Sequence, residues 1–187
     1  MKNLFLVLLL AIVGAGSSCA QKSQPAGMRM EVAESESDNG DYSIFTYKDE
    51  DETFGYYLAL SQTSNFLGGD EVLGMQVKNI SEIAIWLGAT SDEALATVDD
   101  ILAMFDKDLG TTEVWRGRAV TGSGRLSDAI DAGCVAGKKL LGGKCLQFFF
   151  NSGKRETYAI LTKSVLKELR ANFKFDLKLH PNQHRKK

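Results

Sequence analysis

Two arginines separated by a single residue have a spacing that could bind an anion. Arg116 and Arg118 alternate with Trp115 in the segment "TEVWRGRAV", so in a strand both guanidinium groups lie on the same face. Guanidinium groups bind carboxylates and phosphates through paired hydrogen bonds. The spacing therefore indicates either a clamp for an anion or a solvent-exposed strand face.

The charge along the chain extends this idea to its last third. The net charge is −6 over residues 19–52, −7 over residues 53–134 and +10 over residues 135–187. Such a basic region predicts contact with an anionic surface, unless the acidic first half neutralises it within the fold. The candidate anion-binding residues are Arg116, Arg118, Lys138, Lys139, Lys144, Lys154 and Arg155. We expect no nucleic-acid partner, since three consecutive phenylalanines at 148–150 are more typical of a core strand than of a base-stacking platform.

Histidine chemistry has little support in this chain. The two histidines, His180 and His184, stand in the C-terminal tail on either side of Pro181. A Ser-His-Asp or Cys-His mechanism needs a histidine in the folded body, and zinc sites of the Cys and His kinds need more ligands than these. We therefore expect no catalytic residue of this type and no metal site.

The glycine-rich stretch "VTGSGRLS" follows a predicted strand, as a dinucleotide-binding turn would. Ser127 occupies the third glycine position, and no acidic residue follows about 20 residues later. The stretch is typical of a surface loop, and we expect no cofactor.

Carboxylates leave one enzymatic alternative open. Asp99 and Asp100, or Asp128 and Asp131, would have to pair with acids elsewhere in the chain to hydrolyse a glycoside. Acids on a helix surface are more often simply solvated. A small carboxylate-based hydrolase is the alternative function.

The start of the chain has the features of a secretory signal. Lys2 precedes an apolar run of about a dozen residues, and small residues follow it up to "GSSCAQ". The small residues before Cys19 resemble a bacterial lipoprotein signal, which implies that Cys19 becomes the acylated first residue. Gly16 stands where such signals usually have leucine. Ordinary cleavage after Ala20 is the other reading of the same residues.

Both readings place the protein outside the cytoplasm. It is membrane-anchored by lipid at Cys19, or periplasmic or secreted if it is cleaved after Ala20. The apolar run is shorter than the roughly 20 residues of a spanning helix, so we expect a membrane contact only through the lipid. We divide the chain into a signal at 1–20, a disordered acidic tether at 21–40, one domain at 41–180 and a basic tail at 181–187.

The domain must be built mainly from strands. The segment 53–61 places Phe54, Tyr56, Leu58 and Leu60 on one face and predicts a hairpin with "YSIFTY". "VLGMQV" and "EIAIWL" predict a second pair, and "TEVWRGRAV" a further strand before a loop over 121–133. "CVAGKKLL", "KCLQFFF" and "ETYAIL" then predict strands joined by turns at Gly142–Gly143 and at "NSGKR".

Two amphipathic helices complete the set. The first opens at Thr90 and Glu93 with capping-box spacing, buries Leu95, Val98, Leu102 and Phe105, and stops at Gly110. The second covers 162–173, with Leu166, Leu169 and Phe173 in register. The fold class is α+β, a mainly antiparallel sheet of about six to eight strands with two helices. The recurrence of "LGG", strands and helix suggests a duplicated β-β-β-α unit, with chance recurrence as the alternative.

Cys134 and Cys145 remain after processing. In a hairpin turning at Gly142–Gly143 they stand too far apart for a disulfide, so we expect two buried free thiols. The sequence as a whole favours a non-catalytic binding or structural module of a bacterial envelope. Its expected partner is an envelope protein or an anionic surface, and the basic region 135–187 leaves a polyanion-binding protein as a further alternative.

Overall fold

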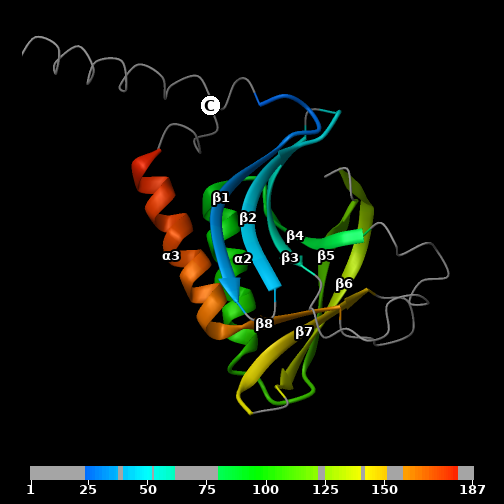
Figure 1. Ribbon diagram of the computed structural model, residues 1–187, viewed down its shortest axis with the longest axis vertical. Helices are drawn as coiled ribbons and strands as arrows, with labels where there is room; N and C mark the ends of the chain where they lie inside the picture. Colours follow the sequence, from blue (N-terminus) through cyan, green and yellow to red (C-terminus); the bar gives the residue numbers. More distant parts are fainter. Residues whose placement is uncertain are drawn as a thin grey trace, which may run out of the picture.

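The computed structural model describes residues 24–37, 40–51, 53–61, 80–121, 125–139, 142–150 and 158–180. They form eight strands and two helices, which Figure 1 labels: β1 (Arg29–Ser37), β2 (Gly40–Lys48), β3 (Phe54–Ser61), β4 (Ile80–Gly88), α2 (Ser91–Met104), β5 (Thr112–Thr121), β6 (Leu126–Lys138), β7 (Lys144–Phe150), β8 (Ala159–Thr162) and α3 (Lys163–Leu179).

The strands form one open antiparallel sheet in which spatial order equals sequence order, from β1 at one edge to β8 at the other. This confirms the predicted α+β class with two helices. In the described residues each helix follows four strands, whereas the predicted repeat unit has three. The predicted strand "VLGMQV" and the first "LGG" lie outside the described residues, so the duplication stays a prediction.

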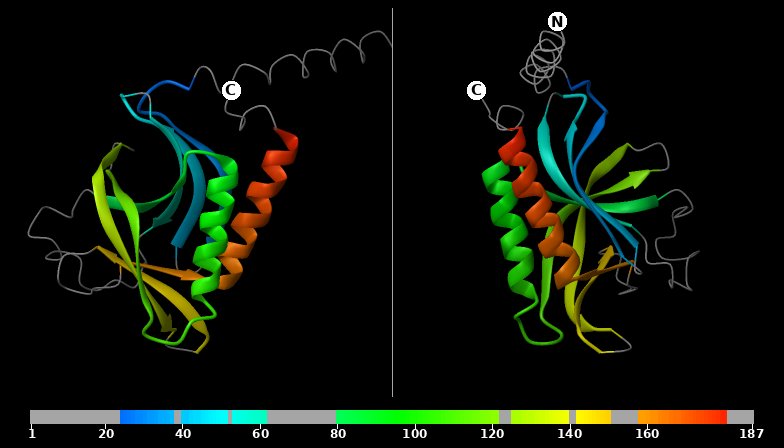
Figure 2. Two further views of the ribbon diagram at one scale, coloured as in Figure 1. Left: turned by 180° about the vertical axis from the view of Figure 1, so that it is seen from behind. Right: turned by 60° about the vertical axis from the view of Figure 1, so that its left-hand side comes forward.

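Both helices pack on the same side of the sheet (Figures 1 and 2). We call this side the helix face. Strand β3 shows how the alternation of side chains builds it, because Tyr56, Leu58 and Leu60 enter the main core beneath the helices, as predicted. Tyr57 and Ala59 point to the other side, where they are also buried. The sheet therefore has an apolar cluster on each face.

Helix α2 begins where the sequence predicts. Thr90 accepts a hydrogen bond from the backbone N–H of Glu93, and the Glu93 carboxylate accepts one from the backbone N–H of Thr90, which completes the capping box. The helix ends at Met104, six residues before the predicted stop at Gly110.

The buried stripe of α2 is rotated from the predicted one. Its fully buried residues are Ala94, Val98, Ile101 and Met104, and its C-cap Phe105 is buried as well. Leu95 and Leu102 are only partly buried at the edge of the core. The smaller Ala94 can lie directly against β4, which moves the two leucines aside.

Helix α3 follows β8 without a loop and runs antiparallel to α2. Leu166, Leu169 and Phe173 are fully buried, as predicted. The Arg170 guanidinium forms a bidentate ion pair with Asp99 of α2, with N···O distances of 2.5 and 2.8 Å. The helix extends to Leu179, beyond the predicted end at 173.

The sheet curls so that its last strand returns toward its first three. The Tyr42 hydroxyl on β2 donates a 2.5 Å hydrogen bond to the carbonyl of Ile160 on β8. In Figure 1, β8 passes the lower ends of β1 and β2, and β7 lies below it. Because Tyr42 belongs to the core beneath the helices, this contact closes the sheet toward them. The opposite face, visible in Figure 2, is hollowed between the end of β2 and the strands β5 and β6.

The prediction of an unstructured tether up to residue 40 is wrong for residues 29–37, which form β1. This strand pairs with β2 over its whole length. It lies at the sheet edge beneath α3, where the Ser35 hydroxyl donates to Glu168 and the Asn172 amide donates to the carbonyl of Glu34. An edge strand pairs with one neighbouring strand only and often carries exposed charged side chains. The acidic composition of β1 therefore resembles that of a tether.

The loop predicted over 121–133 is also wrong from residue 126 onward. Strand β6 has 13 residues and pairs with both β5 and β7. Its small and acidic residues hide the alternation, since its buried side chains are mostly alanine and cysteine. Residues 122–124 lie outside the described part.

Cys134 and Cys145 are buried free thiols, as predicted. The predicted two-residue turn at Gly142–Gly143, which would pair Leu140 with Cys145, is wrong, because Lys138 pairs with Lys144 and Gly137 with Cys145. Cys134 pairs with Phe148, three positions along β7 from Cys145. An odd separation puts the two thiols on opposite faces of the sheet. Burial raises the pKa of Cys134 to about 12.

Candidate functional site

The face of the sheet away from the helices has an aromatic floor. Phe45 and Tyr57 stack with ring centroids 5.5 Å apart, and Trp86 meets Tyr57 edge-on at 5.1 Å. The Trp86 ring lies over Gly55, where a Cβ atom would stand only 1.9 Å from the ring. Glycine at position 55 therefore lets the indole lie flat across the neighbouring strand.

Each of three arginines stands above one ring of this floor. Arg29 lies 4.2 Å from the Phe45 centroid, Arg116 lies 5.7 Å from that of Trp86, and Arg118 lies 6.0 Å from that of Tyr47. Cations at these distances are attracted by the negative face of an aromatic ring. We call this surface, made of the three arginines, Phe45, Tyr47, Tyr57 and Trp86, the arginine face.

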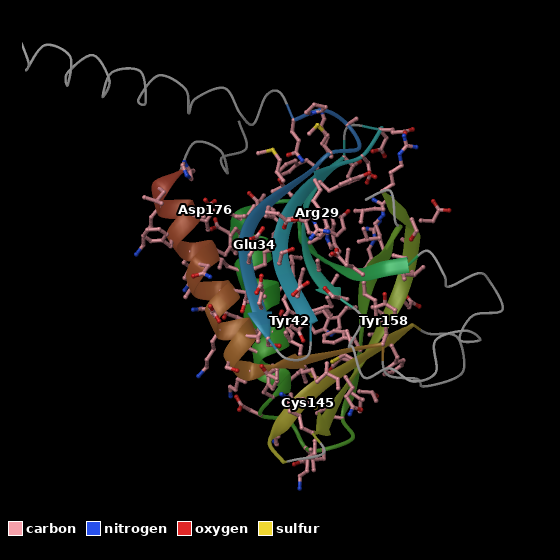
Figure 3. All side chains as sticks on the ribbon, viewed as in Figure 1. Arg29, Glu34, Tyr42, Cys145, Tyr158 and Asp176 are labelled. Carbon is pink, nitrogen blue, oxygen red and sulfur yellow. The ribbon has the colours of Figure 1, made fainter. Side chains whose placement is uncertain are left out.

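Arg29 is held by carboxylates and a hydroxyl. It forms ion pairs with Glu31 and Glu82, and its Nη2 donates a 2.8 Å hydrogen bond to the Ser43 hydroxyl. In Figure 3, Arg29 lies on the side of β1 and β2 away from α3, which carries Asp176. Its charge is thus already neutralised within the fold.

Arg118 is also held by partners within the fold. Its Nη1 donates to Asp49 at 2.5 Å and its Nε donates to the carbonyl of Ser127 at 2.5 Å. These bonds join β5 to the end of β2 and to the start of β6, where the β5–β6 register shifts. Arg118 therefore fixes the local backbone, and only part of its charge remains for a ligand.

Arg116 differs from the other two. Its side chain is exposed, and among the described residues it contacts the Trp86 ring but has no ion-pair partner. Asp131 stands opposite it on β6 without closing an ion pair. Arg116 is therefore the guanidinium of the arginine face that is positioned by the fold and still available to an anion.

A cavity of about 480 Å³ opens beside Arg116. It is lined by Tyr47, Asp49, Glu50, Asp51, Arg116, Arg118, Arg125, Leu126, Asp128 and Ala129. The lining carries three guanidinium groups and four carboxylates, so it is mixed in charge. A ligand with one negative and one positive group fits this lining better than a polyanion does.

Two pKa shifts describe the electrostatics near the cavity. Burial raises the pKa of Tyr57, while its hydrogen bond with Arg118 and the positive charge of that residue lower it. Hydrogen bonds from Thr53, above all from its backbone N–H, hold the pKa of Asp51 below its usual range. The Asp51 carboxyl is therefore ionised at neutral pH and is not a proton donor there.

The structure brings only part of the predicted anion-binding set together. Arg116 and Arg118 share the cavity, as their spacing predicts. Lys138, Lys139 and Lys144 lie at the β6–β7 hairpin, where Lys144 donates to the carbonyl of Lys107. Asp131, opposite Arg116, is seven residues from Lys138 along β6, a distance of about 23 Å. Lys154 and Arg155 lie outside the described residues, as does Cys19.

Of the acids considered for a hydrolase, Asp128 shares the cavity lining with Asp49, Glu50 and Asp51, whereas Asp99 does not line the cavity. Arg170 binds Asp99 and lowers the pKa of its carboxyl through that hydrogen bond, on the helix surface far from the cavity. Asp128 lines the cavity, whereas Asp131 is an exposed residue of β6. His180 caps α3, with its Nε2 3.9 Å from Asp176. No group of three metal-ligating side chains gathers within the described ranges.

The sequence reasoning missed Arg29, Tyr47, Asp49 and Arg125. Arg29 was assigned to a tether, so its position on a strand face went unnoticed. Tyr47 and Asp49 carried a signal, because Tyr47 belongs to the same alternating face as Phe45 in a segment predicted to be a strand. The pairing of β2 through β3 and β4 to β5, which one sequence does not reveal, brings Tyr47 and Asp49 beside Arg118.

No protein family, curated protein or solved structure matches this chain. In the part of the chain that the structure describes, neither helix is long and apolar enough to cross a membrane.

Proposed function

We propose that the protein is a non-catalytic binding module of the bacterial cell envelope, anchored through a lipid at Cys19. Its arginine face binds a small zwitterionic ligand, such as a short peptide, with the negative group of the ligand on Arg116. The observation that carries the ligand site is the contrast among the three arginines, since Arg29 and Arg118 have carboxylate partners and Arg116 has none among the described residues.

The other lining residues support the zwitterionic class. Glu50 and Asp128 are exposed carboxylates of the same cavity, so they provide acceptors for a ligand ammonium group. The Trp86 ring keeps the Arg116 guanidinium near the floor and lowers the entropy lost when an anion binds it.

Titration of the isotope-labelled protein with alanyl-alanine, with inorganic phosphate as a second probe, tests the ligand site by NMR. We expect the dipeptide to shift amide signals of β5 and β6 around the cavity and phosphate to shift them less. Arg116→Met should abolish these shifts. Lys144→Met, which removes a candidate cation at the far hairpin, is the matched control and should leave them unchanged.

Three results would contradict this proposal. Absence of dipeptide binding, or equal loss in both variants, would remove the site at Arg116. Cleavage of a peptide or glycoside probe would favour the alternative of a carboxylate hydrolase. Stronger binding of heparin that depends on Lys144 would favour the polyanion-binding alternative.

Intact mass and the N-terminal peptide of the protein from its native membrane fraction test the anchor. An acylated Cys19 at the N-terminus is the expected result. A chain that begins at Gln21 without lipid would instead make the protein periplasmic or secreted.

A further inference from the structure

The chain is fixed to the sheet only five residues after Cys19. The Gln24 side chain is buried, and its amide donates hydrogen bonds to the carbonyls of Met28 at 2.7 Å and Thr46 at 3.3 Å. The Thr46 hydroxyl donates back to the Gln24 amide oxygen at 3.2 Å. Five residues reach at most about 18 Å, so an acyl group on Cys19 would hold the Gln24 end of the domain close to the bilayer.

This end of the domain exposes apolar side chains from two elements. Met28 and Met30 lie at the start of β1, and Phe175 and Leu179 lie one turn apart near the end of α3, with exposed fractions of 39 to 63%. They account for four of the six large exposed apolar side chains in the described residues. The name "anchor end" is used below for these four residues together.

The two elements meet because α3 runs antiparallel to β1. Glu168 contacts Ser35 and Asn172 contacts Glu34, so later helix residues lie beside earlier strand residues. In Figures 1 and 2 the start of β1 and the end of α3 are at the same end of the molecule. The other two exposed apolar residues, Leu109 and Val114, follow the C-terminus of α2, which lies beside the N-terminus of α3, as the Lys163–Asp106 ion pair shows.

On α3 the charge at the anchor end is basic and suits an anionic membrane surface, whereas the β2–β3 turn, bonded to Gly27, exposes Glu50 and Asp51. Residues 174–187 contain five lysines and arginines and one acid, Asp176. Lys178 is exposed in the last turn of α3, and Lys174 is partly exposed one turn earlier. Basic residues beside apolar ones are attracted to anionic headgroups while the apolar side chains enter the interface.

We propose that the anchor end is a membrane-contact surface, on which Met28, Met30, Phe175 and Leu179 enter the headgroup region of an anionic bilayer. The proposal rests on the acylated Cys19 of the proposed function for the position of the bilayer. It departs from the sequence-based expectation of contact through the lipid alone by adding a second contact. It also adds an orientation, in which α3 points its C-terminus at the membrane and the β6–β7 hairpin faces away from it.

Fluorescence quenching in reconstituted vesicles tests this orientation. The acylated full chain carries a bimane label at F175C or, as the matched control on the same helix, at S164C. The positions are 11 residues apart, or about 16 Å along the helix. Both are exposed, and the buried Cys134 and Cys145 leave the unlabelled parent as a blank. The vesicles contain phosphatidylethanolamine, phosphatidylglycerol and spin-labelled lipid.

Quenching at position 175 should exceed quenching at position 164 several-fold, and Lys174→Glu with Lys178→Glu should reduce it. Equal quenching at both positions, or stronger quenching at 164, would overturn the proposal.

Mass spectrometry of the same preparation separates the two proposals. If Cys19 carries no lipid, the anchor fails, and quenching at 175 with the unmodified protein then decides the contact surface alone. Quenching at position 175 would support the membrane-contact surface, and no quenching there would overturn it.

Discussion

The two faces of the sheet are built by alternate residues of the same strands, yet they differ in chemistry. The helix face is mostly aliphatic and is closed by α2 and α3, with Phe173 against Tyr56 at its centre. The arginine face has aromatic rings and arginines above them, and the helices do not cover it. One face can therefore supply most of the stability while the other holds charged groups in fixed positions.

The largest effect is expected on the helix face, from Phe173→Ala. Its ring is fully buried and packs 5.5 Å from the Tyr56 ring, so its removal should lower the free energy of unfolding by about 3 to 5 kcal/mol. Urea denaturation measures the loss. Phe175→Ala, an exposed change two residues along the same helix, is the control and should cost less than about 0.5 kcal/mol. Similar losses in both would mean that α3 does not close the core as described.

On the arginine face, Arg118→Met should have the largest effect on stability. It leaves the Asp49 carboxylate and the Ser127 carbonyl without their donor, at a cost of about 1 to 3 kcal/mol. A double-mutant cycle with Asp49→Asn isolates the ion pair. Additive losses would show that the two side chains do not interact.

Tyr56 on the helix face and Tyr57 on the arginine face allow the pH dependence of stability to be compared between the two faces. Burial raises the pKa of Tyr56, and the charge of Asp176 raises it further, whereas Arg118 counteracts the rise at Tyr57. The native state keeps the Tyr56 proton where the unfolded state loses it, so stability is intact below about pH 10 and falls as the pH rises above it.

At pH 11, one unit above the ordinary tyrosine pKa, this loss reaches about 1.4 kcal/mol for Tyr56. Tyr56→Phe should remove that part of the alkaline loss, and Tyr57→Phe should remove less. Denaturation at several pH values, with the tyrosinate absorbance, checks both. An equal effect of the two variants would mean that Arg118 does not influence Tyr57.

The smallest change in stability is expected for Arg116→Met. Its guanidinium is exposed and has no ion pair among the described residues, so the cost should stay below about 0.5 kcal/mol although ligand binding is lost. Together with Arg118→Met it separates a positioning role from a binding role on the same strand. A loss above 1 kcal/mol would show that Arg116 is structural instead.

Local patterns predicted the elements whose stabilising interactions are local. Thr90 and Glu93 cap α2 within one turn, and Tyr56, Leu58 and Leu60 reveal their face by alternation alone. The pair Arg116 and Arg118 was found in the same way. In each case, the residues that decide the structure lie within a few positions of one another.

The features that the sequence did not predict involve residues whose environment is set by distant parts of the chain. Strand β1 is held by backbone pairing with β2 and by contacts with Glu168 and Asn172, more than 130 positions away. Arg29 reaches the arginine face only through that pairing. The stripe of α2 likewise depends on how closely Ala94 can approach the sheet, which helical periodicity alone does not determine.

Helix α3 is the last described element to be synthesised, and it covers the first. Each strand from β2 to β8 can pair with the strand just made before it, because sheet order follows sequence order. Ala33 and the neighbouring apolar surface must wait for Leu169 and Phe173, which emerge only with residues 163–179. A chain that is synthesised from its N-terminus thus exposes an incomplete apolar sheet until its final segment emerges. Folding of this protein therefore requires either a holding chaperone or completion fast enough to outpace aggregation.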